Sequence, residues 1–126
     1  LVILFLILFL IFGIIGFLRY QVPTSIKFDF YSGPCNIRID PYNRSNLGIK
    51  EIKWLNNTLQ VKAYVSINCA EKIEDGFYEI EGDKIILIYK SPTCRICAKC
   101  MCTHELIYKF FDLDKKDYQF ELKRIE

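Results

Sequence analysis

The sequence contains little of what catalysis and nucleic-acid binding require. It has one histidine, no Ser-His-Asp set, no glycine-rich phosphate loop and no pair of carboxylates at an informative spacing. Its 17 basic and 15 acidic residues are interspersed, so it lacks the field of one sign that is typical of nucleic-acid binders. These absences predict a protein that is not an enzyme, holds no cofactor and binds no nucleic acid.

The longest apolar run lies at the N-terminal end of the chain. Residues Leu1 to Leu18 carry no charged or hydrogen-bonding side chain. As a helix they would extend about 27 Å, close to the hydrocarbon thickness of a bilayer. Arg19 and Tyr20 are residue types found at membrane interfaces, and Pro23 predicts the end of the helix. The run therefore predicts a transmembrane helix.

This interpretation divides the chain into an anchor helix over residues 1–22 and one domain over residues 23–126. Two other roles for the apolar run stay open, a cleaved secretory signal and the core of a filament. The positive-inside rule, applied to the cations after the helix, favours a cytoplasmic domain. The cysteines and two candidate N-glycosylation sites, at Asn43 and Asn56, instead favour export. We expect a single-pass protein of the cell membrane with its C-terminal domain outside.

Beyond the apolar run, apolar and polar side chains alternate, which is typical of half-buried strands. The longest such segment runs from Thr58 to Cys69 and keeps this period throughout. The same alternation occurs at Ile26, Phe28 and Phe30, at Cys35, Ile37 and Ile39, at Leu106, Tyr108 and Phe110, and at Tyr118, Phe120 and Leu122. These apolar residues are predicted to face a common core.

Turn signals complete the prediction of the fold. Gly82-Asp83 separates two β-rich runs between Phe77 and Tyr89 and predicts a hairpin. A further short strand is expected from Ile49 to Trp54. About eight short strands separated by turn residues point to an antiparallel arrangement. The expected fold is therefore all-β, a single antiparallel β-sandwich of immunoglobulin-like size that follows one transmembrane helix.

Six cysteines in a small exported domain predict a disulfide framework. Cys35 and Cys69 each extend the inward face of a predicted strand, so we expect them to form one bridge. In the chain-entropy model that bridge would stabilise the domain by about 4 kcal/mol.

The other four cysteines crowd into the segment from Cys94 to His104. Three pairings of these four are open. The geometry of adjacent strands favours a nested arrangement, with Cys94 paired to Cys102 and Cys97 paired to Cys100.

A metal or iron-sulfur site is the alternative, with thiolates from Cys94, Cys97, Cys100 and Cys102 and a further donor from His104. The spacing matches neither a ferredoxin run nor a split zinc site, and an exported domain favours bridges over thiolates. His104 beside Cys100 or Cys102 could also form a Cys-His couple, although a histidine on a strand surface is the commoner outcome.

Several stretches carry a resemblance to known proteins. The segments TLQVKAYVSINCA, GDKIILIYK, ELIYKFFDL and DYQFEL, with a C-x-C before the third, resemble small uncharacterised archaeal membrane-anchored or secreted β-sandwich proteins. That resemblance covers the domain after the anchor and implies a fold and a location, but no activity. The order of an apolar helix and then a β-domain is also similar to archaeal type IV pilins, whose helices are usually longer than this one.

These features together predict a membrane-anchored cell-surface protein with a structural or protein-interaction role. One alternative is a filament subunit whose apolar helix lies in the filament core. Another is a redox protein that binds a metal or an iron-sulfur cluster through the segment from Cys94 to His104.

Overall fold

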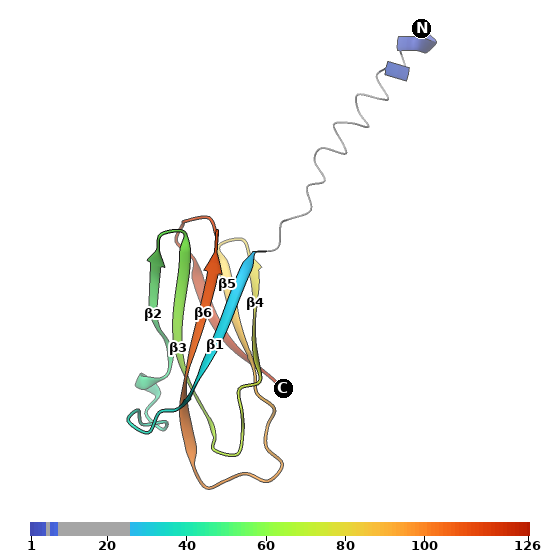
Figure 1. Cartoon of the computed structure of the whole chain (residues 1–126). Coiled ribbons are helices and arrows are strands. Elements are labelled where there is room, and N and C mark those ends of the chain that lie inside the picture. Colours follow the sequence, from blue (N-terminus) through green and yellow to red (C-terminus); the bar gives the residue numbers. More distant parts are fainter. Residues whose placement is uncertain (5, 8–25) are drawn as a thin grey trace.

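A computed structural model describes residues 1–4, 6–7 and 26–126, and strands dominate it (Figure 1). The strands and the one short 3-10 helix, η1, are β1 (Lys27–Cys35), η1 (Arg44–Asn46), β2 (Gly48–Leu55), β3 (Thr58–Asn68), β4 (Asp75–Glu81), β5 (Lys84–Lys90), β6 (Met101–Phe111) and β7 (Gln119–Ile125). The prediction of an all-β domain is confirmed.

The strands form two sheets that enclose one core. The larger sheet has the order β1-β6-β3-β2, and the smaller has the order β4-β5-β7. Buried side chains from both sheets meet between them: Leu59, Val61, Ala63, Val65, Ile85, Leu87, Leu106, Tyr108, Phe110 and Leu113. Most of these residues hold the inward positions of β3, β5 and β6, so burial of the alternating apolar face stabilises the domain.

Strand β3 follows its predicted alternation without a break. Every second residue from Leu59 to Ile67 is buried, and the residues between them are partly exposed. The predicted hairpin at Gly82-Asp83 is also confirmed, since Glu81 at the end of β4 is paired with Lys84 at the start of β5. Local sequence pattern is sufficient for these features because alternation within a strand and the turn of a hairpin are both encoded by neighbouring residues.

One predicted strand is wrong. The alternation of Cys35, Ile37 and Ile39 continues beyond the end of β1, but the chain turns there and Ile37 is 94% exposed. The Asn36 side chain accepts a hydrogen bond from the Arg38 amide at 3.0 Å, as Asp40 does from the Tyr42 amide at 2.9 Å. Such bonds compete with a strand ladder. The described residues therefore form seven strands, against about eight expected.

The prediction of a purely antiparallel sandwich also needs correction. Strands β5 and β7 are paired in parallel, from Lys84 with Gln119 to Lys90 with Ile125. Between them the chain passes through β6, which belongs to the other sheet and runs the opposite way. The chain therefore returns to the smaller sheet in the direction of β5. Alternation of apolar and polar residues within a strand does not indicate whether that strand pairs in parallel or antiparallel with its neighbour.

The sandwich has two different ends (Figure 1). We call one the turn end: it contains the connections β2–β3, β4–β5 and β6–β7, and β1 begins there. We call the other the cystine end: it contains the connections over residues 36–47, 69–74 and 91–100. Any segment before β1 therefore joins the domain at the end opposite the cystine end.

Aromatic side chains join the two sheets beside β1. The ring of Phe28 lies 4.8 Å from the ring of Tyr78 on β4, between ring centres. Gly76 on β4 is buried against the ring of Phe30, so closely that an added Cβ atom would overlap that ring. The absence of a side chain at Gly76 therefore allows β1 to pack against β4.

The predicted anchor falls mostly outside the described residues. Of the run from Leu1 to Leu18, the structure describes residues 1–4 and 6–7, and residues 2–4 and 6–7 are helical. Among all described residues, no helix combines the length and the apolar character that crossing a membrane requires. The transmembrane helix stays a prediction.

Candidate functional site

Three disulfide bridges gather at the cystine end. They join Cys35 to Cys102, Cys69 to Cys100 and Cys94 to Cys97, and they use every cysteine of the chain. The prediction that all six cysteines form bridges is confirmed. Both predicted pairings, Cys35 with Cys69 and the nested arrangement of the other four, are wrong.

Sheet order explains the observed pairing. Strand β6 lies between β1 and β3, so it separates Cys35, the last residue of β1, from Cys69, which directly follows β3. The register places Ile67 opposite Cys102, and two residues further along Cys69 lies opposite Cys100. Cys102 forms its bridge on the other side, with Cys35 of β1. The C-x-C spacing indicates that Cys100 and Cys102 lie on one face, but it does not indicate the partner of either.

The two inter-strand bridges lie side by side. The Cys69 Sγ atom is 3.7 Å from the Cys102 Sγ atom, although the two belong to different bridges. Together the bridges link the ends of β1 and β3 to the beginning of β6. They therefore hold three adjacent strands together at the cystine end.

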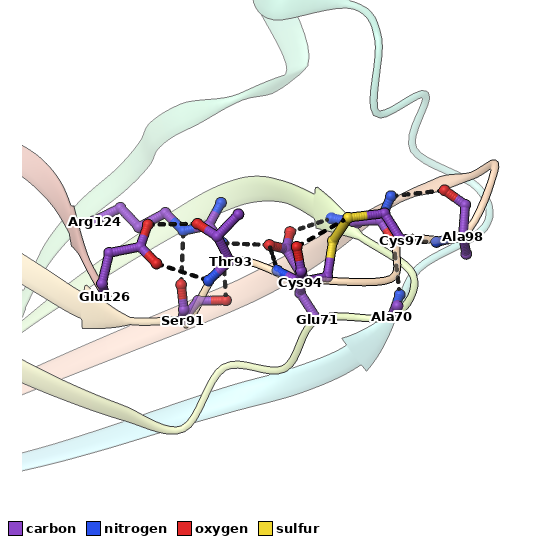
Figure 2. The surroundings of a disulfide bond; sticks show 10 residues. Ala70, Glu71, Ser91, Thr93, Cys94, Cys97, Ala98, Arg124 and Glu126 are labelled. Atoms are coloured by element: carbon purple, nitrogen blue, oxygen red, sulfur yellow. Dashed lines mark hydrogen bonds and ion pairs between the residues drawn. A yellow bond between two sulfur atoms is a disulfide. The ribbon is translucent and has the colours of Figure 1, made fainter.

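The third bridge, Cys94–Cys97, closes a short loop that side chains from other segments hold in place (Figure 2). The Asn68 side chain accepts a hydrogen bond from the Ala98 amide and donates one to the Ala98 carbonyl, both at 2.9 Å. On the other flank, a Glu71 carboxylate oxygen accepts from the Cys94 amide at 3.0 Å. The loop is thus bound on both sides of its C-x-x-C segment.

Glu71 is the centre of this hydrogen-bond network. Its side chain is only 5% exposed, and it accepts further bonds from the Asn68 amide at 2.8 Å and from Arg124 Nη2 at 2.8 Å. Burial alone would raise the pKa of Glu71. The hydrogen bonds from the Asn68 and Cys94 amides and the Arg124 guanidinium together outweigh burial and lower that pKa below its usual value.

Parallel pairing brings Arg124 to the site. Because β7 runs in the direction of β5, its last residues reach the cystine end, where Arg124 Nε also donates to the Ser91 carbonyl at 2.9 Å. The carboxylate of Glu126 accepts from the Thr93 amide at 2.8 Å. Neither Glu71 nor Arg124 was predicted from the sequence, because only the unexpected parallel strand brings them together.

His104 is not placed for either of its predicted roles, as a metal ligand or as part of a Cys-His couple. Its Nδ1 atom is 2.9 Å from the Gly33 carbonyl oxygen, a contact between β6 and β1. The thiols of the predicted Cys-His couple, Cys100 and Cys102, are both in bridges. Within the part of the chain that the structure describes, no group of three or more histidine, cysteine or acidic side chains is placed to hold a metal ion.

The cystine end also exposes apolar side chains. Ile37 is 94% exposed, Ile96 at the tip of the Cys94–Cys97 loop is 91% exposed, and Tyr42 is 70% exposed. A shallow hollow of about 380 Å³ lies beside them, with Cys35, Ile37, Tyr42, Cys69 and Met101 among its lining residues. The two candidate glycosylation sites are at opposite ends of the domain: Asn43 precedes η1 and Asn56 is in the β2–β3 turn.

Comparison with known proteins yields no relative: neither a family model, nor a curated protein, nor a solved structure matches the chain.

Proposed function

We propose that the chain is a membrane-anchored protein of the cell surface whose sandwich domain presents its cystine end to a protein or cell-envelope partner, in a structural or binding role without catalysis. The observation that carries the proposal is the separation of the two ends. The N-terminal segment joins the domain at the turn end. With that segment in the membrane, the cystine end is the part of the domain furthest from the bilayer.

The character of the cystine end supports a role in binding. Burial of exposed apolar residues such as Ile37 and Ile96 against a partner would lower the free energy of the complex. The backbone that carries them is already ordered by bridges and by the bonds of Asn68 and Glu71. A partner would therefore bind without the entropic cost of ordering these loops.

The location can be tested with lysine labelling in intact cells. The full chain is expressed in cells, treated with an amine-reactive label that does not cross membranes, and analysed by peptide mass spectrometry. Both Lys99 at the cystine end and Lys27 at the turn end are exposed. We expect the protein to fractionate with membranes and both lysines to be labelled in intact cells. Lys99 should react faster than Lys27. A variant that lacks residues 1–22 is the control and should appear in the soluble fraction.

Two results would overturn the proposal. Labelling of Lys99 only after the cells are lysed would place the domain inside the cell. Release of the full chain by mechanical shear, as filaments visible by electron microscopy, would favour the filament subunit instead.

A further inference from the structure

We propose that the Cys94–Cys97 bridge is a thiol-disulfide exchange site that accepts two electrons from a dithiol. The three bridges of this domain are unequal, and their positions in the fold separate one from the other two. This activity goes beyond a binding role and does not depend on the anchor.

The span of each bridge is the first argument. Cys35–Cys102 joins residues 67 apart and Cys69–Cys100 joins residues 31 apart, whereas Cys94 and Cys97 are only 3 apart. Opening a bridge with a long span restores much conformational freedom to the unfolded chain, so it weakens the fold most. Opening Cys94–Cys97 frees only two intervening residues, so the fold depends on it least.

Non-covalent contacts on both flanks are the second argument. The Asn68 side chain holds both backbone groups of Ala98, and Glu71 holds the amide of Cys94. These bonds do not involve sulfur and persist when the bridge opens. The Cys97 Sγ atom lies 3.3 Å from the Cys94 carbonyl oxygen, so a thiol at Cys97 can donate to that oxygen without moving. The two thiols would stay close enough to close again.

Access and charge are the third argument. Cys97 and its neighbour Ile96 are exposed, whereas Cys94 is half-buried, so an incoming thiolate reaches Cys97 first. Arg95 lies between the two cysteines and is exposed, and its positive charge favours a thiolate at the leaving sulfur. The nearby carboxylate of Glu71 opposes this effect little, because it is paired with Arg124 at 2.8 Å.

The exchange has two balanced steps. One thiolate of the dithiol attacks Cys97 Sγ, the Cys94–Cys97 bond breaks, and Cys94 leaves as a thiolate that takes up a proton from water. The second thiolate of the dithiol then attacks the dithiol sulfur of the mixed disulfide and releases Cys97, which is also protonated. The dithiol is oxidised to a disulfide, and the bridge is reduced to two thiols by two electrons.

The test is stepwise reduction of the full chain with dithiothreitol, followed by alkylation and peptide mass mapping, with circular dichroism on the same samples. We expect Cys94 and Cys97 to be alkylated at a dithiothreitol concentration at least about tenfold below that needed for the other four cysteines, with the β-sheet signal unchanged. Reduction of all three bridges in one step, together with loss of that signal, would overturn the inference.

A second measurement separates exchange from simple reduction and tests whether the electron donor is a dithiol. Oxidised protein is mixed with a reduced peptide that contains its own C-x-x-C pair, and, in a separate arm, with glutathione. Oxidation of the peptide supports the proposed dithiol partner, whereas mixed disulfides with glutathione and no oxidation of the peptide would overturn it. The variant with Cys94→Ser and Cys97→Ser should lose reaction in both arms and keep its fold. Equal reaction of that variant and the parent chain would refute the assignment.

Discussion

The connections between strands are stabilised in different ways at the two ends of the sandwich. At the turn end, two of the three connections consist only of Asn56-Asn57 and Gly82-Asp83, in which Asn56 and Gly82 adopt positive φ angles of 57° and 60°. At the cystine end no connection is as short as these two, and disulfides and buried side chains hold the connections there. Short connections thus depend on the conformational preferences of one or two residues, while long ones depend on contacts with distant segments.

Removal of the bridge with the longest span should reduce the stability of the domain most. Cys35→Ala combined with Cys102→Ala should lower the free energy of unfolding by about 4 kcal/mol, because the unfolded chain regains the freedom of a long loop. Urea denaturation of the full chain measures this. The matched control combines Cys94→Ala with Cys97→Ala, for which we expect a loss of about 1–2 kcal/mol. Equal losses for the two pairs would contradict the ranking of the bridges.

Glu71→Gln tests the contribution of the Glu71 ion pair and hydrogen bonds to the stability of the cystine end. The change leaves Arg124 without its charged partner and should cost about 2–3 kcal/mol in denaturant unfolding. Glu74→Gln is the control, since the Glu74 side chain is 50% exposed and its pair with Lys90 spans 3.6 Å. We expect that change to cost less than about 0.5 kcal/mol. A similar cost for the two variants would show that burial of Glu71 is unimportant.

The same glutamate should make stability depend on pH. The pKa of Glu71 in the folded domain lies below the value of 4.5 expected for the unfolded chain. The stabilisation is therefore fully present above pH 4.5 and is lost as the pH falls through the folded-state pKa. Thermal melts of the parent and Glu71→Gln proteins between pH 7 and about pH 3 should converge on acidification. If the melting temperatures of the two proteins differed by the same amount at every pH, the ionised form of Glu71 would not be the source of the stabilisation.

A test midway between the two ends is Gly76→Ala. The new methyl group would overlap the Phe30 ring, which is packed against the Tyr108 ring, so we expect a loss of about 2 kcal/mol from overpacking. Gly33→Ala is the control because its nearest contact would be an ordinary 3.7 Å from the Glu105 Cβ atom. A midpoint of urea denaturation for Gly76→Ala equal to that of the control would contradict close packing of β1 on β4.

At the turn end the smallest effect is expected, from Asn56→Ala. Alanine tolerates the φ angle of 57° less well than asparagine, so the variant should lose about 1 kcal/mol. Asn56→Gly should match or slightly exceed the parent. Both changes also remove the candidate glycosylation site, so unglycosylated protein is used for the melts. A loss of stability with glycine equal to that with alanine would rule out the backbone explanation.

The sequence predicted the features that neighbouring residues encode. The alternation from Leu59 to Ile67 and the hairpin at Gly82-Asp83 are local patterns, and both are found as expected. The bridge partners of Cys35 and Cys69 are set by the order of strands in the sheet, which no local pattern encodes. The ion pair of Glu71 with Arg124 likewise depends on the parallel strand β7.

Strand β1 also determines how the domain would respond to tension. A pull on the cystine end, with the N-terminal segment held, acts along the long axis of the sandwich and loads the β1–β6 hydrogen bonds in shear, all at the same time. A force on the loop before β6 passes from Cys102 through its bridge to Cys35 at the far end of β1. The load path therefore includes a covalent link, and β1 cannot slide out of the sheet while that link is intact.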